Sequence, residues 1–291
     1  MTPTPQTPAP DLTPPADLPD QVAAALREDI GGGDVTAQLV PADQRVRGRV
    51  VTREDAVLCG RPWAEEVFRR LDPGIRLSWR ATDGERVAAG AVIFEIEGRA
   101  RPILTGERNA LNFLQLLSAT ATQASHFAAA VAGTDCSVID TRKTIPGLRT
   151  AQKYAVRCGG CRNHRMGLYD MILIKENHIA AAGSITAAIT AARRVSQGLK
   201  VEVEVESLQE LEEALRAGPD IVLLDDFSLE DLAAAVALNR SLGRPVAFEA
   251  SGSVSLETVR AIAATGVDFV SSGGLTKNVR AIDLSMRFAQ D

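Results

Sequence analysis

The second half of the chain repeats one pattern, in which a short apolar run is followed by polar residues and then by a stretch with helical periodicity. Six apolar runs predict strands at residues 137–140, 171–174, 201–205, 221–224, 246–248 and 269–271. Amphipathic helices are predicted between them, most clearly at residues 184–195, 207–217, 229–242 and 255–264. Strands that alternate with helices predict a parallel sheet, because each right-handed crossover helix covers one face of the sheet.

Polar residues or glycines end or follow every one of these strands. They are Thr141, Arg142 and Lys143; Lys175, Glu176 and Asn177; Glu204 and Glu206; Asp225 and Asp226; Ser251, Gly252 and Ser253; and Ser272, Gly273 and Gly274. Strands that close into a barrel bring such positions together at one mouth, where barrel enzymes build their sites. A dinucleotide-binding open sheet is less favoured, because no Gly-x-Gly-x-x-Gly follows the first strand. Six strands instead of eight predict an irregular or reduced α/β barrel.

The first half of the chain predicts a different domain. Residues 1–15 are rich in Pro and Thr and predict a disordered tail. A helix is expected after Pro19, with Asp20 as its cap, and it ends at Gly31. Residues 45–98 alternate with period two around one helix at 62–71, and residues 105–132 predict one long linking helix. We therefore expect an α+β domain at 16–132 and a barrel domain at 133–291, whose last helix can pack back on the first domain.

One stretch of the first domain raises an alternative function. Residues 84–94 resemble a strand pair of lipoyl or biotinyl carrier domains. Such a carrier needs a lysine at an exposed hairpin tip, and no lysine precedes Lys143. A carrier or structural module is therefore the less favoured alternative.

Charge separates the possible ligands. The 291-residue chain has a net charge of -5 and is 45% hydrophobic, yet cations concentrate between Arg142 and His178. This pattern indicates a pocket for a multiply anionic small molecule, whereas a nucleic-acid-binding protein is usually basic across a whole face. No apolar run approaches the roughly 18 residues of a membrane span, and the start lacks a signal-peptide pattern. Four cysteines are too few for a disulfide scaffold, so we expect a cytoplasmic protein without nucleic-acid or membrane partners.

The predicted mouth has groups for several anions. Arg142 and Arg165 offer forked donors, and Lys143 and Lys175 offer point charges, for carboxylate or phosphate. The two late glycine sets allow close approach to a phosphate, aided by the positive end of a helix starting near Ser255.

Other polar groups of the predicted mouth fit more than one role. Glu204 and Asp225 suit ribose hydroxyls or a Mg²⁺ ion carried by a diphosphate. His164 is expected in the site and His126 to be structural, while His178 fits either role. The pair Cys158-x-x-Cys161 has no second cysteine or Cys/His pair at suitable spacing, so zinc or redox chemistry is not favoured.

At these residues the chain resembles a known family, the quinolinate phosphoribosyltransferases. The matching segments are spread through nearly the whole chain, and only the Pro-rich tail lies outside: residues 28–36, 59–63, 107–113, 140–149, 163–165, 174–178, 202–204 and 276–277.

The resemblance implies a type II phosphoribosyltransferase fold and a specific reaction. The ring nitrogen of quinolinate attacks 5-phosphoribosyl-1-pyrophosphate, diphosphate leaves with Mg²⁺, and loss of CO₂ gives nicotinate mononucleotide for NAD biosynthesis. The carboxylates would be held by Arg108, Arg142, His164 and Arg165. Lys143 and Lys175 would contact the dianion or phosphates, and Glu204 and Asp225 would face the ribose and metal. The catalytic set would be Lys143, Lys175, Glu204 and Asp225. The wider substrate-binding set adds Thr141 and the glycine sets Ser251–Ser253 and Ser272–Gly274.

The family also implies a homodimer with shared active sites, or a higher oligomer built from it, in which Arg108 serves the neighbouring subunit. The departures from the family pattern are Ala119, Cys161, Ser272 and Lys277. A phosphoribosyltransferase for another pyridine base, such as nicotinate, is the alternative within this class. It would need fewer cations, because its substrate has a single carboxylate.

Overall fold

A computed structural model describes residues 12–242 and 246–289 of the chain. Two compact units are formed by the described residues of Met1–Ser125, Ile145–Gly160 and Val279–Asp291, and by those of His126–Thr144 and Cys161–Asn278. These units are assembled from separate segments, whereas the domains expected at 16–132 and 133–291 are each continuous. The tail expected at 1–15 lies, up to residue 11, outside the described residues.

The first unit is built on an antiparallel sheet with the strand order β12-β1-β5-β3. Its strands are β1 (Arg45–Thr52), β3 (Arg76–Trp79), β5 (Val92–Arg99) and β12 (Leu284–Phe288), and β2 (Ala56–Val57) pairs separately with β4 (Arg86–Val87). Its helices are α1 (Leu18–Ile30), η1 (Ala37–Leu39), α2 (Arg61–Leu71), α4 (Arg149–Cys158) and most of α3 (Ala100–Ala130). Trp63 and Phe68 of α2 and Phe94 of β5 are fully buried and form the centre of its core.

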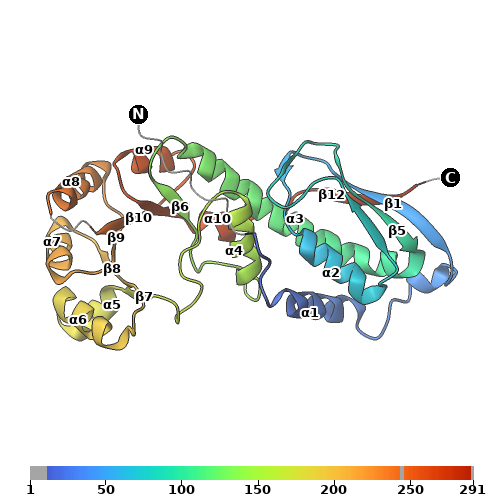
Figure 1. The fold of residues 1–291 in the computed structure, drawn as a ribbon, viewed down its shortest axis with the longest axis horizontal. Helices are drawn as coiled ribbons and strands as arrows, with labels where there is room; N and C mark the ends of the chain where they lie inside the picture. The colour runs from blue at the N-terminus through green and yellow to red at the C-terminus, as the bar shows by residue number, and fades with distance from the viewer. Residues whose placement is uncertain (1–11, 243–245, 290–291) are drawn as a thin grey trace. The chain divides into compact units, whose positions relative to one another are not determined.

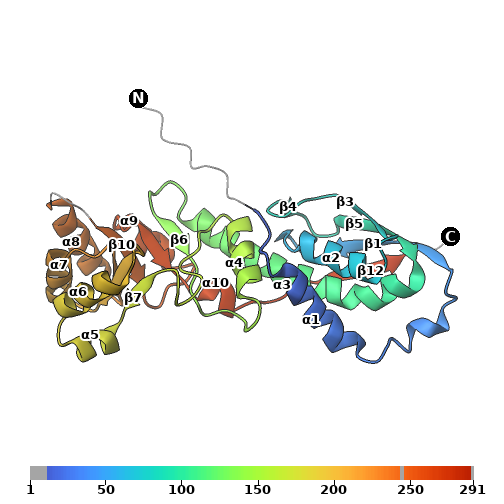
Figure 2. The same ribbon diagram turned by 60° about the horizontal axis from the view of Figure 1, so that its bottom comes forward.

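Three elements of this unit differ from the sequence-based expectation. Helix α1 begins at Leu18 with Asp17 as N-cap, not at Asp20, because Pro19 is tolerated in a first turn that needs no N–H from it. Helix α3 begins at Ala100 instead of Thr105, whose hydroxyl bonds to Asp34 and to the Arg101 carbonyl. A last helix of the second domain was expected to pack back on the first domain. The last described element is instead strand β12, which pairs with β1 (Figure 2).

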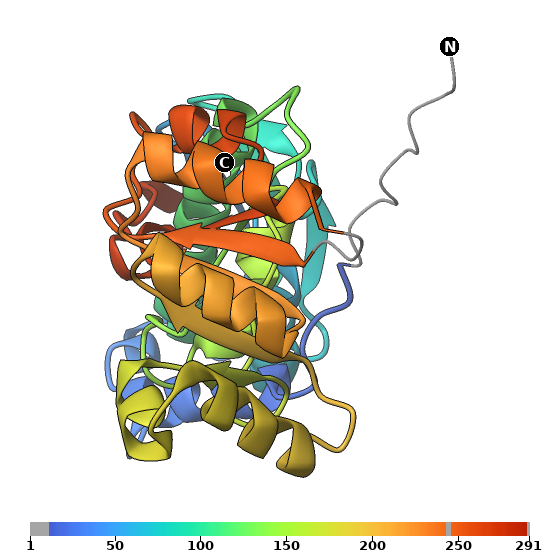
Figure 3. The same ribbon diagram turned by 90° about the vertical axis from the view of Figure 1, so that its left-hand side faces the viewer.

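The second unit confirms the parallel sheet and its six strands. They are β6 (Ser137–Ile139), β7 (Ile172–Ile174), β8 (Val201–Val205), β9 (Ile221–Asp225), β10 (Ala247–Ser251) and β11 (Phe269–Ser271), in the order β6-β11-β10-β9-β8-β7. The helices are α5 (Glu176–Ala182), α6 (Ile185–Val195), α7 (Leu208–Ala217), α8 (Leu229–Arg240), α9 (Val259–Ala264) and α10 (Gly274–Lys277). Helices α6, α7 and α8 lie in a row outside the strands (Figure 1), as Figure 3 shows from the side. Within the described residues no pairing joins β6 to β7, so this is a reduced, incompletely closed α/β barrel.

Two boundaries of the second unit matter for the site. Strand β10 begins at Ala247, because the backbone N–H and C=O of Val246 bond to the side chain of Asn239. Helix α9 begins at Val259, and Ser255 is held in a turn in which its N–H bonds to Thr258. The helix expected to start near Ser255 is therefore too short and too late to direct its positive end at a phosphate. Among the described residues, no helix combines the length and apolar character needed to span a membrane.

Candidate functional site

A cavity of about 730 Å³ opens at the carboxyl ends of the parallel strands. It gathers the predicted mouth residues, which are Thr141, Arg142, Lys143, His164, Arg165, Lys175, Glu204, Asp225, Ser251, Gly252, Ser253, Ser272, Gly273 and Gly274. The strand-end pattern predicted these neighbours in space except for His164 and Arg165, which lie in a loop. It also included Glu176, Asn177, Glu206 and Asp226, which do not line the cavity. The roles of the lining residues remain predictions. Arg108 does not line this cavity, because it lies exposed on the part of α3 that belongs to the first unit.

The sheet register places acids on the inner face. Glu204 of β8, Leu223 of β9 and Glu249 of β10 lie level with one another, and all three line the cavity. Glu202 is two residues before Glu204 and therefore lies on the same face of β8. The floor of the cavity is consequently acidic, while its rim carries the cations.

Two guanidinium groups meet at this rim. The pKa of Arg165 is lowered, mainly by burial and then by the positive charge of Arg142. The Arg165 guanidinium also donates to the Met171 carbonyl at 3.3 Å, which fixes its direction. Two guanidinium groups that repel each other in one cavity suit a ligand with two carboxylates, because each carboxylate would reduce the repulsion.

The two lysines of the rim have different surroundings. Lys143 packs against Gly273, where an added Cβ would lie 2.9 Å from the Lys143 Cδ atom, and Thr276 bonds to its carbonyl at 2.9 Å. Lys175 instead forms an ion pair with Glu204. Burial raises the pKa of Glu204, which the hydrogen bond from Lys175 opposes.

His164 is held through its backbone and both ring nitrogens. Its N–H donates to Asp140 at 2.9 Å, and Asn163 donates to the same fully buried carboxylate at 2.6 Å. The ring Nδ1 accepts the Arg165 N–H at 2.6 Å, and Nε2 lies 3.0 Å from Glu202 and 3.3 Å from Glu249.

This cluster retains protons. Burial disfavours the His164 imidazolium, but the hydrogen bonds and charges of the two glutamates outweigh it and raise the pKa to about 9. Because Nδ1 accepts the Arg165 N–H, the proton that the cluster retains is shared between Nε2 and the two glutamates, and Nδ1 carries none. Burial, with the charge of Glu249, raises the pKa of Glu202 to about 7 against the effect of His164.

The loops after β9 and β10 are strained against each other. Asp226 (φ 57) and Ser253 (φ 45) adopt the left-handed region, and so does Gly252 (φ 94). A Cβ on Gly252 would lie 2.8 Å from the Cα of Asp226, so only glycine fits. Beside them, Ser251 donates its hydroxyl to Asp225. The backbone at this end of the cavity is thus held in one conformation.

Comparisons with known proteins agree with this geometry. Residues 34–118 match the model of the quinolinate phosphoribosyl transferase N-terminal domain, and residues 120–287 match that of the C-terminal domain. The chain belongs to the quinolinate phosphoribosyl transferase family.

Relatives and solved structures of this family cover almost the whole chain. A protein of Mycobacterium leprae named nicotinate-nucleotide pyrophosphorylase [carboxylating] is 42% identical over 92% of this chain and 95% of its own length. The probable enzyme of that name from Synechocystis sp. is 41% identical over 91% of this chain and 90% of its own. The structure of the nicotinate-nucleotide pyrophosphorylase from Francisella tularensis has a TM-score of 0.91 and 47% identity, covering 95% of this chain and 98% of that one.

Several cavity residues of this family member were not predicted from the strand ends. Glu249, Lys277 and Asn278 line the cavity, and Glu202 lies behind it. The signal for the two glutamates was available, because each is an acid inside an otherwise apolar buried strand. Nothing in the local sequence of Lys277 indicates that its side chain lines the cavity.

The remaining histidines lie outside the cavity lining. His178 accepts the Lys175 N–H at 3.0 Å and thereby takes part in capping α5. His126 was expected to be structural, but it is exposed on α3.

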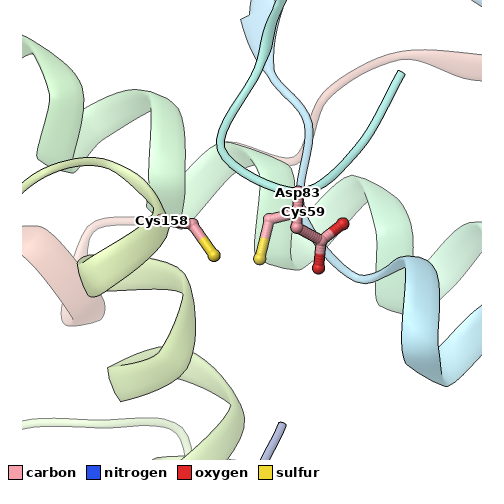
Figure 4. Close-up of side chains that lie close together, drawn as sticks. All are labelled: Cys59, Asp83 and Cys158. Atoms are coloured by element: carbon pink, nitrogen blue, oxygen red, sulfur yellow. The ribbon is translucent and has the colours of Figure 1, made fainter. Parts of the chain in front are cut away.

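The Cys-x-x-Cys pair does not form one site. Cys158 belongs to the first unit, where its sulfur lies near the sulfur of Cys59 and the carboxylate of Asp83 (Figure 4). The two sulfur atoms and one carboxylate oxygen lie within 4.8 Å of one another. Asp83 accepts hydrogen bonds from the N–H groups of Gly60 and Arg61, both at 3.1 Å, and from Tyr154 at 2.8 Å. Burial raises the pKa of Cys59, and burial followed by the charge of Asp140 raises that of Cys161 to about 12. These thiols are therefore protonated and poorly reactive.

Proposed function

We propose that this family member transfers the phosphoribosyl group of 5-phosphoribosyl-1-pyrophosphate to quinolinate, giving nicotinate mononucleotide, diphosphate and CO₂ in NAD biosynthesis. The ring nitrogen forms a bond to the anomeric carbon as the bond to diphosphate breaks. The bond to the adjacent carboxylate then breaks, CO₂ leaves with the electron pair remaining on the ring carbon, and that carbon takes a proton.

The observation that carries this proposal is the meeting of Arg142 and Arg165 at one rim. A pyridine dicarboxylate offers two anions at the spacing of neighbouring ring carbons, and the two guanidinium forks supply matching donors. Nicotinate has one carboxylate and would leave part of this charge unbalanced. Lys143 and Lys175 add charge for the second carboxylate or the diphosphate.

The acids of the site suit the other substrate. Positive charge develops on the ribose as diphosphate leaves, and we expect Glu204 and Asp225, which line the cavity, to stabilise it. The strained loops around Gly252 and the Ser272–Gly274 segment would hold the 5'-phosphate by their backbone N–H groups.

The same proposal includes Mg²⁺ as the metal, a homodimer whose subunits share active sites, and a cytoplasmic location. Carboxylate and hydroxyl oxygens are ligands that Mg²⁺ prefers, and Glu204, Asp225 and Ser251 provide them next to the expected diphosphate. Bound with the diphosphate, the ion would offset the negative charge of the leaving group. The exposed Arg108 is proposed to act in the cavity of a second copy, and four free cysteines are consistent with a reducing compartment.

The test is an assay with Mg²⁺, the sugar diphosphate and either quinolinate or nicotinate, in which diphosphate and CO₂ are both measured. We expect equal amounts of the two products from quinolinate and little diphosphate from nicotinate. Diphosphate release with nicotinate alone would favour the other pyridine base, and no CO₂ from quinolinate would contradict the proposal.

A further inference from the structure

The buried glutamates of β8 and β10 are not explained by stability. Glu202 and Glu249 are 0% and 2% exposed, and burying two neighbouring carboxylates is costly. Glu202 Oε1 is buried and finds no hydrogen-bond partner among the residues that the structure describes. Well-packed apolar side chains at such positions are often at least as stabilising. Their presence next to a cavity therefore indicates a functional requirement.

The hydrogen bonds of His164 show what the glutamates hold. Because Nδ1 accepts the Arg165 N–H at 2.6 Å, the network assigns the ring proton to Nε2. That proton points to Glu202 at 3.0 Å and to Glu249 at 3.3 Å. The imidazole is thus fixed at both ends, between two rigid strands and the main chain of Arg165.

The same three side chains are close enough to suggest a metal site, since their ligand atoms lie within 4.8 Å of one another. A metal would need the lone pair of Nε2. The tautomer set by the Arg165 N–H places a proton there instead, so the geometry favours a hydrogen-bonded clamp over a metal centre.

We propose that Glu202 and Glu249 are positioning residues that act through His164 on the main chain of Arg165, and so hold the Arg142–Arg165 pair ready for an aromatic 1,2-dicarboxylate. This inference rests on the proposed function for the identity of the ligand. It gives His164 a different role from the direct carboxylate contact that the family resemblance implied. Each ring nitrogen already has a partner, so the ring serves to place Arg165. A loop positioned in this way loses less freedom when the ligand binds, and displacements of about 1 Å at such sites can cost on the order of 100-fold in rate.

Two substitutions at one position separate this role from a structural one. Glu202→Leu removes the acceptor at similar volume, while Glu202→Gln keeps an oxygen for the Nε2 proton. We expect Leu to raise the KM for quinolinate on the order of 10-fold, with the KM for the sugar diphosphate and the Tm nearly unchanged. Gln should restore most of the affinity. Equal rises in both KM values, or a Gln variant no better than Leu, would overturn the inference.

A double-mutant cycle tests the route through the imidazole. In a His164→Ala background, Glu202→Leu should cause no further loss, because the link to Arg165 is already cut. Losses that simply multiply would show that Glu202 acts independently of His164. If the Glu202→Leu variant does not fold, the same cycle is run with Glu249→Leu, which removes the acceptor that lies 3.3 Å from Nε2.

Binding without turnover distinguishes a failure of this inference from a failure of the proposed function. Benzene-1,2-dicarboxylate lacks the ring nitrogen, so calorimetry measures only recognition of the two carboxylates. Weaker binding by Glu202→Leu than by wild type supports the clamp even if quinolinate is not converted. Unchanged binding, in a protein that converts quinolinate, overturns the clamp alone.

Discussion

At the scale of single residues, the loop around Gly252 shows most clearly how backbone strain serves a site. Asp226 and Ser253 both adopt the left-handed backbone conformation there. Gly252 lies where the two loops meet and lets them touch, because it has no side chain. Strained conformations of this kind persist only where the surrounding structure enforces them. The proposed phosphate site is therefore shaped before any ligand arrives.

Gly252→Ala tests this arrangement. The added Cβ would lie 2.8 Å from Asp226 Cα, so the loops must separate. We expect a loss of about 1–3 kcal/mol in the free energy of unfolding and a several-fold rise in the KM for the sugar diphosphate. Urea unfolding and initial rates measure the two effects.

Gly218→Ala is the matched control, because Gly218 is also left-handed (φ 71) but has no atom within 4 Å of an added Cβ. It should lose stability only through its backbone conformation and leave the KM unchanged. A Gly252→Ala enzyme with the KM of the Gly218→Ala enzyme would contradict a preformed phosphate loop.

The sequence predicted the site to the extent that it follows from where strands end. Arg142, Lys175 and Asp225 follow buried apolar runs, so parallel pairing alone brings them to one cavity. The clamp of His164 could not be predicted in this way, because it depends on which face of β8 and β10 points inward and on one imidazole tautomer. Register and hydrogen bonding decide both, and neither is visible in a local pattern.

At the scale of elements, the start of α2 is organised by a residue from a distant turn. Gly60 and Arg61 open the helix without a side-chain cap of their own, and Asp83 accepts both of their N–H groups. Tyr154 of α4 binds the same carboxylate. One buried acid thus joins two helices and the β4 region of the first unit.

Asp83→Ala should therefore cost more than the loss of an ordinary surface contact. A buried N–H group, a partly buried one and a buried hydroxyl would lose their acceptor, and we expect a fall of about 1–3 kcal/mol in the free energy of unfolding, measured in urea. Asp55→Ala is the control, since Asp55 accepts a single exposed N–H from Ala89. Equal losses in the two variants would show that Asp83 does not organise this helix start.

Element types were more predictable than their ends. All six parallel strands follow from apolar runs, because burial on both faces leaves a clear signal. The start of α9 did not follow, since Ser255 satisfies its own N–H within a turn. A last helix that packs back on the first domain was expected, without defined bounds. Strand β12 was not predicted, because its pairing with β1 joins residues more than 200 positions apart.

At the scale of the whole molecule, the expected homodimer makes a specific prediction about Arg108. If this residue serves a neighbouring cavity, Arg108→Ala and Lys143→Ala place their defects in different sites of a mixed dimer. After subunit exchange about half of the dimers are mixed and each regains one intact site, so activity should return to about a quarter of wild type.

Each variant alone, taken through the same exchange, should stay inactive. Mass spectrometry of differently tagged subunits confirms that exchange occurred. Mixed dimers without activity would show that Arg108 acts in the active site of its own subunit.

Strand β12 has a consequence for how the protein is made. Its partner β1 leaves the ribosome early, yet β12 lies at residues 284–288 and follows on the order of tens of seconds later at common rates of synthesis. Until then β1 has an open edge, which invites pairing with other chains. The second unit, by contrast, is complete in sequence at Asn278. The unit encoded first is therefore completed last, when β12 emerges and pairs with β1.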